Sequence, residues 1–170
     1  MQLRVLESGD AASFTAIRLA ALRECPTAFS SSYEEECDTP LAQAAERIVP
    51  NSGRAIFGAF DGESLVGTLG LYRENRLKLK HKAVIWGVYV APAFRKRGVG
   101  RMLLARALEH ARSMADLRQI TLGVNTENAA AIALYKSAGF EPFGLERGFM
   151  RVDGVLHDEL HMVLTIAKHG

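Results

Sequence analysis

The sequence predicts a single α/β domain over residues 1–170, in which helices flank a mixed, mostly antiparallel β-sheet in the order β-αα-βββ-α-β-α-ββ. Three observations predict this class. Apolar residues make up 48% of the chain and charged residues 24%, which excludes a disordered or collagen-like protein. Short β-rich runs alternate with segments at helical spacing. No repeat, linker or low-complexity tract divides the chain.

The first third of the chain predicts a strand, two helices and the connection between the helices, over residues 3–6, 11–24, 39–48 and 26–38. Asp10 stands where a side chain would cap the first helix, and Pro26 ends that helix. Thr39 and Pro40 are a typical start for the second helix. The connection is rich in serine and then acidic, so we expect it to be solvated.

The middle of the chain predicts three strands over residues 54–60, 63–73 and 83–90. Between the first two, Asp61 and Gly62 favour a two-residue hairpin turn. Residues 76–80 (RLKLK) alternate like an exposed strand edge protected by lysine. We expect these three strands to form part of the mixed sheet.

The remaining elements are a long helix, a strand, a second helix and two closing strands, over residues 99–114, 119–125, 128–138, 140–145 and 155–164. Asn128 is placed to cap the second of these helices, and Gly139 suits the left-handed residue that ends it.

Several functional classes are excluded or disfavoured by composition. Cys25 and Cys37 have neither a CxxC nor a zinc-knuckle spacing, so we expect no disulfide scaffold, a reducing compartment and a cytoplasmic location. No apolar run approaches the 18 residues of a spanning helix, and the first residues lack a signal-peptide core, so we expect no membrane partner. A net charge of +2 is too small to favour nucleic acid.

The chemistry is concentrated in a basic, glycine-containing loop between a strand and the long helix: Arg95, Lys96, Arg97, Gly98, Val99, Gly100 and Arg101. Its glycines let the backbone approach a ligand, and the first N–H groups of the helix have no partner within the helix. Such a site binds phosphate. It is not a P-loop, since no Gly-Lys-Ser/Thr follows. It is not the dinucleotide G-x-G-x-x-G either, because Leu103 stands in place of the third glycine. Another phosphate-bearing carrier is therefore expected.

Two segments resemble the signatures of the GNAT superfamily of N-acetyltransferases. The first is Val88–Pro92 followed by RKRGVGRMLL, which is similar to its coenzyme A motif. The second lies about thirty residues on and comprises Leu122, Val124, Asn128, Ala131, Leu134, Tyr135, Gly139 and Phe140. The resemblance implies a GNAT-like fold and transfer of acetyl from acetyl-CoA to a primary amine by direct attack in a ternary complex, without a metal.

The resemblance also implies roles for individual residues. Backbone groups of Val88, Tyr89 and Val90 would pair with the pantetheine arm and reach the thioester oxygen. The loop from Arg95 to Arg101 would bind the pyrophosphate, and Asn128 the pantetheine portion. Tyr135 would be the general acid that protonates the departing thiolate. From the residues alone, Tyr135 equally suits packing on the sheet, and Asn128 a helix cap.

One departure leaves the general base open. Several members that acetylate N-terminal amines have a glutamate where this sequence has Gly123, and the missing side chain would leave room at the floor of the cleft. We take Glu35 as the first candidate. The alternatives lie beside it and near the end of the chain: Glu34, Glu36, His157, Asp158, Glu159 and His161. His157 and His161 do not form a zinc motif.

The missing glutamate also motivates an alternative function, a non-catalytic acyl-CoA sensor or partner-binding module on the same fold. The acceptor would be a small-molecule amine or the amine of a protein or peptide, and the protein a monomer or a homodimer. The sequence does not choose among these.

Overall fold

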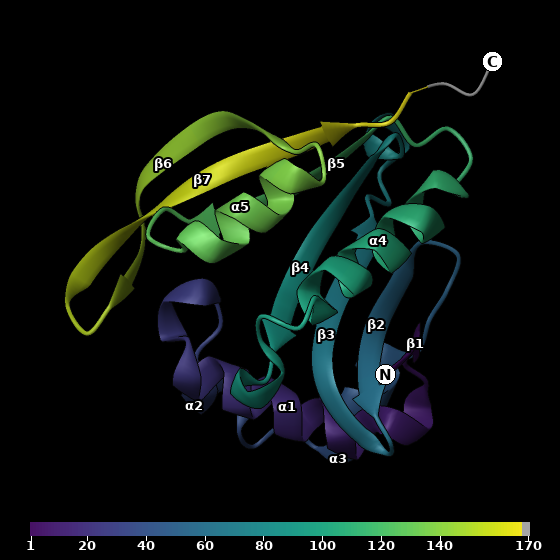
Figure 1. Cartoon of the computed structure of the whole chain (residues 1–170), viewed down its shortest axis with the longest axis vertical. Helices are drawn as coiled ribbons and strands as arrows, with labels where there is room; N and C mark the ends of the chain where they lie inside the picture. Colours follow the sequence, from purple (N-terminus) through teal and green to yellow (C-terminus); the bar gives the residue numbers. More distant parts are fainter. Residues whose placement is uncertain (168–170) are drawn as a thin grey trace.

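The computed structural model describes residues 1–167, which form a seven-stranded sheet of strand order β1-β2-β3-β4-β5-β7-β6 (Figure 1). The strands are β1 Gln2–Val5, β2 Arg54–Asp61, β3 Ser64–Arg73, β4 Lys82–Val90, β5 Gln119–Asn125, β6 Glu141–Val152 and β7 Val155–Thr165. Neighbouring strands are antiparallel except β4 and β5, which are parallel. The predicted mixed, mostly antiparallel sheet is thus confirmed.

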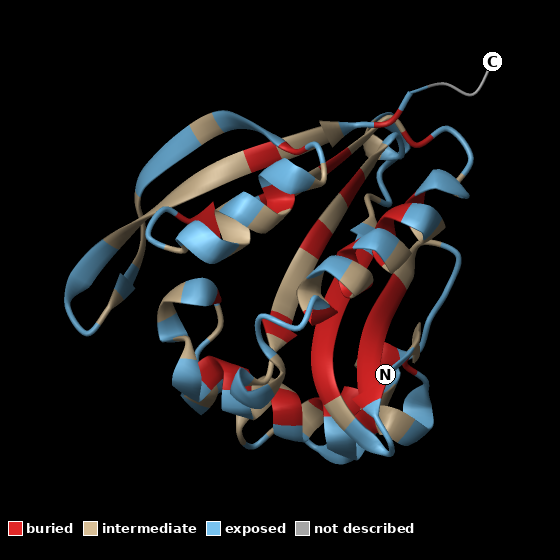
Figure 2. Cartoon of the chain, in the orientation of Figure 1, coloured by how far each residue is buried: buried red, intermediate tan, exposed pale blue. Residues whose placement is uncertain are grey.

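Helices cover both faces of the sheet: α1 Ala11–Glu24, α2 Tyr33–Glu36, α3 Leu41–Ile48, α4 Val99–Arg112 and α5 Ala129–Ser137. Figure 1 shows α4 and α5 in front of the sheet. The main core lies beneath them, where α4 buries Leu103 and Ala107 against the inner strands. On the other face, α1 and α3 pack on Ile56 and Phe60 of β2. Figure 2 shows that β2 and β3 are the most continuously buried strands, because both of their faces are covered.

Two local predictions in the N-terminal half of the chain are wrong. Asp10 does not cap α1: its carboxylate accepts two 2.7 Å bonds from Arg4 and one from the backbone N–H of Glu7. A short 3₁₀ turn precedes α1, and it turns this side chain toward β1. The first hairpin turns at Gly62 and Glu63 rather than Asp61 and Gly62, because Asp61 still pairs with Ser64.

Two further segments differ from expectation for topological reasons. Residues 76–80 are not a strand edge; β3 and β4 pair with each other, and 77–79 form a 3₁₀ turn in the loop that joins them. Strand β6 continues to Val152, beyond the predicted end at residue 145, after a register shift between Glu146 and Met150. Within the expected connection 26–38, a capping box starts the short helix α2.

In the described residues, no helix is both long and apolar enough to span a membrane.

Candidate active site

The sheet splits between its two parallel strands. Strands β4 and β5 pair only from Lys82 to Val84, opposite Gln119 to Thr121, and Figure 1 shows them diverging beyond this point. A bulge at Gly87, whose φ is +61°, bends β4 away, and its carbonyl accepts a bond from Thr68. The predicted splaying of the strand that carries Val88, Tyr89 and Val90 is therefore present. Beyond Val84 the edge of β4 that faces β5 pairs with no strand in residues 1–167, although the Val90 carbonyl accepts a bond from Nε of Arg95, so most of this edge is open to an extended ligand.

The basic loop lies at the start of α4, beside the end of β4. Gly98 is the N-cap residue; it has φ +80°, and no side chain caps this end of the helix. A Cβ at Gly98 would meet nothing within 4 Å, and the first N–H groups of the helix have no partner within it. Lys96 also has a positive φ, +59°, so the loop backbone is curved, as in anion-binding nests. Val99 is buried and anchors the helix, so it can reach a ligand only through its backbone.

The basic side chains of the loop do not share one role. Arg95 turns back from the loop: its Nη2 lies 2.6 Å from a Glu24 oxygen, and its Nε donates to the carbonyl of Val90. The hydroxyl of Tyr89 donates to the same carboxylate at 2.6 Å. This bond, more than the neighbouring arginine, lowers the pKa of Glu24, and burial raises the pKa of Tyr89 to about 12. The three side chains therefore tie β4 and the loop to α1.

The other cations of the loop remain near its surface. Arg97 lies over the ring of Phe94, 5.3 Å from its centroid. Lys96 and Arg101 are exposed. The loop thus combines an uncapped helix end with three accessible positive charges, a combination that fits the diphosphate of coenzyme A.

Helix α5 carries the other two residues expected to contact the coenzyme. Tyr135 is 5% exposed and meets Phe140 edge to face. Burial raises its pKa to about 12, so the phenol keeps its proton at neutral pH. Its hydroxyl has no hydrogen-bond partner among the residues the structure describes. Asn128 caps α5, since its side chain accepts from the backbone N–H of Ala131 at 3.1 Å.

The space above Gly123 is occupied, so the expectation of room there is wrong. A Cβ on Gly123 would lie 2.1 Å from Oε1 of Glu159 and 2.4 Å from its Cδ. The register of β5 and β7 causes this overlap, because Glu159 pairs with Asn125 and its side chain reaches over the neighbouring glycine. A carboxylate therefore does lie over this position of β5, but it comes from the adjacent strand.

Glu159 lies in an environment suited to proton transfer. Its side chain is 14% exposed, and burial raises its pKa above the ordinary value, although His161 opposes that shift. Nδ1 of His161 is 3.6 Å from Oε1 of Glu159, and Nε2 is 3.1 Å from Glu146. The three groups form a row that ends at the more exposed Glu146.

All but one of the remaining base candidates contact other groups. The carboxylate of Glu35, the first candidate, is exposed and accepts from the backbone N–H of Ser32 in the capping box of α2. Glu36 is paired with Arg18, and Asp158 accepts from the N–H of Gly148. His157 lies 3.3 Å from Glu127, and Glu34 makes no side-chain bond among residues 1–167. Of all the candidates, Glu159 alone overlies β5 at the split.

These features define a class of protein. A split sheet exposes a strand edge, an uncapped helix end lies beside it, and a buried tyrosine and a carboxylate flank the opening on opposite faces. This is the architecture of an acyltransferase that holds a diphosphate-bearing carrier. In residues 1–167 no three His, Cys, Asp or Glu side chains are grouped to hold a metal ion.

The chain belongs to the acetyltransferase (GNAT) family, whose model matches residues 18–140. It is 40% identical over 118 residues to the N-alpha-acetyltransferase RimI of Mycobacterium tuberculosis, covering 69% of this chain and 72% of that relative. It is also 28% identical to a spermidine N(1)-acetyltransferase of Vibrio cholerae, over 99% of this chain and 95% of the relative. The chain is thus an acetyl-CoA-dependent N-acetyltransferase, as the two motifs predicted.

A solved structure supports the same fold. The protein yncA of Salmonella typhimurium, determined with its cofactor acetyl-CoA, superposes with a TM-score of 0.82 at 23% identity. The match covers all of this chain and 96% of that one. The predicted GNAT-like architecture is confirmed.

Proposed function

We propose that this N-acetyltransferase moves the acetyl group directly from acetyl-CoA to a primary amine in a ternary complex, with Glu159 as general base and Tyr135 as general acid. The observation that carries the proposal is the carboxylate of Glu159 lying over Gly123, beside the split in the sheet. It replaces the missing side chain of β5.

Backbone groups of α4 and β4 support the proposed binding of coenzyme A. The N–H groups at the start of α4, with Lys96, Arg97 and Arg101, would hold the diphosphate. The free edge of Val88 to Val90 would align the pantetheine arm as an added strand does. Acetyl-CoA supplies an acetyl thioester, whose carbonyl oxygen needs a positioned donor as negative charge develops on it. A backbone N–H of this edge is that donor.

Proton transfer on the acceptor side depends on Glu159. An ammonium group cannot attack a thioester, so the amine must lose a proton before or during attack. The raised pKa of Glu159 makes its carboxylate a stronger base than an ordinary exposed glutamate. His161 and Glu146 lie behind it in a row and lead the proton toward solvent.

Tyr135 acts on the opposite face. The leaving thiolate has an ordinary thiol pKa of about 8.5 and departs more easily when it is protonated. A buried phenol that stays neutral at pH 7 can donate that proton. The reason for considering a non-catalytic acyl-CoA sensor was the missing glutamate at Gly123. Under this proposal Glu159 supplies that carboxylate, so the reason no longer applies.

The test measures acetyl-CoA binding by calorimetry and thiol release with a panel of primary amines. We expect Glu159→Gln to lower kcat by roughly 100- to 10,000-fold and Tyr135→Phe by roughly 10- to 1,000-fold, while acetyl-CoA binding persists in both. Glu63→Gln, on an exposed turn, is the matched control. If the parent protein does not bind acetyl-CoA saturably, the proposed function is wrong. If the rate of thiol release is unchanged in either variant, the substituted residue does not have the role proposed for it.

A further inference from the structure

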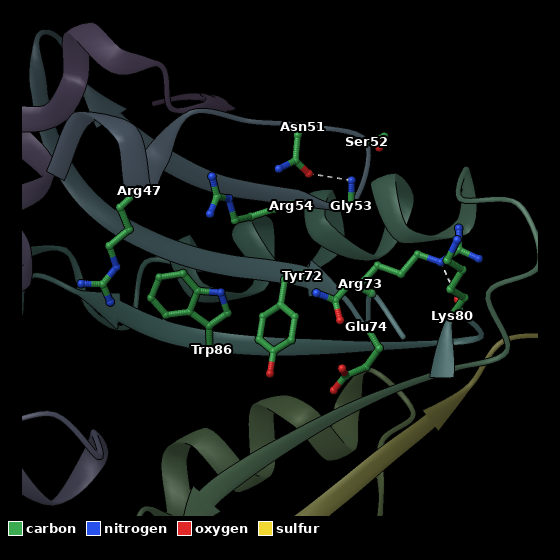
Figure 3. A pocket seen from close by; sticks show the side chains of 11 residues that line it. Arg47, Asn51, Ser52, Gly53, Arg54, Tyr72, Arg73, Glu74, Lys80 and Trp86 are labelled. Carbon is green, nitrogen blue, oxygen red and sulfur yellow. Dashed lines mark hydrogen bonds between the residues drawn. The ribbon is translucent and has the colours of Figure 1, made fainter. Parts of the chain in front are cut away.

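A cavity of about 760 Å³ opens on the sheet face that α1 and α3 cover, and Figure 3 shows its lining. Trp86 of β4 and Tyr72 of β3 form its aromatic floor. The indole lies flat on β3 because residue 70 is glycine: a Cβ there would be 2.3 Å from Cε2 of Trp86. The floor is therefore fixed by the sequence of two adjacent strands.

Positive charge surrounds this floor. Arg47, Arg54, Arg73 and Lys80 line the cavity, against a single carboxylate, Glu74. Arg47 stacks over Trp86 at 5.4 Å and shares Glu36 with Arg18. Within residues 1–167, the other three cations form no ion pair.

Arg54 is one of the partly buried cations of this cavity. Its Nη2 donates to the carbonyls of Glu46 and Val49, at 3.3 and 3.2 Å. Its Nε is buried without a hydrogen-bond partner in the described part of the chain. Burying a guanidinium N–H unpaired is costly, which favours a site that an acceptor oxygen completes.

The cavity adjoins the proposed reaction centre. Val84 is the last β4 residue to pair with β5, where it faces Thr121. Two residues further along each strand are Trp86 and Gly123, which keep to the same face because side chains alternate. Trp86 belongs to the floor of the cavity, and Gly123 lies beneath the carboxylate of Glu159. The cavity thus lies on the same face of the sheet as Glu159, opposite α4, and Trp86 is the lining residue that stands at the start of the split.

We infer that this cavity binds the body of the acceptor, and that the acceptor is a small primary amine with a carboxylate or phosphoryl group next to a flat or apolar portion. The inference rests on the proposed function. The volume is in the range of small-molecule sites. A polyamine is disfavoured, since its charges would meet four cations and one carboxylate.

The first experiment uses the fluorescence of Trp86, which is the only tryptophan in the chain. The protein, saturated with coenzyme A, is titrated with L-amino acids, their α-carboxamides, 2-aminoethylphosphonate and spermidine. We expect at least one amino acid to shift the emission with a Kd at least 10-fold below that of its α-carboxamide, or the phosphonate to do so with a Kd at least 10-fold below that of spermidine. The stronger of the two anions identifies the group. Equal or tighter binding of the carboxamides or spermidine would overturn the inference.

The second experiment tests the cations, with Arg106→Gln on the exposed surface of α4 as matched control. Arg54→Gln and Arg73→Gln should each weaken the preferred anionic amine by roughly 10- to 100-fold and leave its carboxamide unchanged. Because the Arg54 side chain bonds two carbonyls and, among residues 1–167, that of Arg73 bonds only the carbonyl of Lys80, Arg73→Gln serves if the first variant fails to fold. Equal effects on both ligands would contradict the assignment.

Thiol release with the same ligands separates the two proposals. Turnover without any preference for anionic amines would leave the acetyltransferase mechanism standing and overturn the cavity's role. Charge-selective fluorescence shifts without turnover would support the ligand site and refute the mechanism.

Discussion

Replacing Gly123 with alanine tests the role of Glu159 without altering the carboxylate itself. The new Cβ would lie 2.1 Å from Oε1, whereas ordinary contacts begin near 3.4 Å. The carboxylate must therefore move by about 1 Å or more, and a displacement of that size in a catalytic group costs roughly 100-fold in rate. We expect kcat/KM for the amine to fall by about that factor.

The assay is steady-state thiol release, with calorimetry of acetyl-CoA as a second readout. Acetyl-CoA affinity should not change, because Gly123 faces away from α4. Gly9→Ala is the matched control, since a Cβ at Gly9 would meet nothing within 4 Å. The double variant Gly123→Glu with Glu159→Ala moves the carboxylate to β5 and should recover at least 10-fold of the activity that Glu159→Ala loses. If Gly123→Ala keeps the parent's kcat/KM while folding normally, the assignment of Glu159 is wrong.

Three further predictions concern titration and capping. Because the pKa of Glu159 is raised, the acidic limb of kcat/KM should have its midpoint above 4.5, and Glu159→Gln should flatten it in a pH–rate profile. Asn128→Ala removes the bond to the N–H of Ala131 and should cost about 1 kcal/mol in urea unfolding. The pKa of Asp10 is lowered below 3.8, chiefly by its hydrogen bond from Arg4, so its stabilisation exists above that pH and is lost as the pH falls. The Tm difference between Asp10→Asn and the parent should accordingly shrink from pH 7 to pH 3.

The coenzyme side could be predicted from sequence because its determinants are local. The role of Gly98 as the N-cap residue depends only on its own φ and on the helix that follows it. That helix, α4, can be predicted from the helical spacing of its apolar residues. The same holds for Asn128, whose capping bond spans three residues.

The acceptor side could not be predicted in this way, because its residues meet only through strand pairing. Nothing near Gly123 in the sequence indicates that Glu159 fills its space; the β5–β7 register decides that. The floor of the cavity likewise depends on Trp86 crossing Gly70 on the neighbouring strand. The side chain of Asp10 could not be placed from the sequence for the same reason. Its carboxylate bonds to Arg4 of β1 instead of capping the helix.

The short pairing between β4 and β5 has a mechanical consequence. The backbone ladder joins β1–β4 to β5–β7 through three residue pairs only, so the two portions can pivot about that corner more freely than strands joined along their whole length. Acetyl-CoA bound in the opening, as proposed above, would contact both portions at once. At one hundred times its Kd it adds about 2.7 kcal/mol to the folded state, and the amides on either side of the hinge should then exchange their hydrogens more slowly.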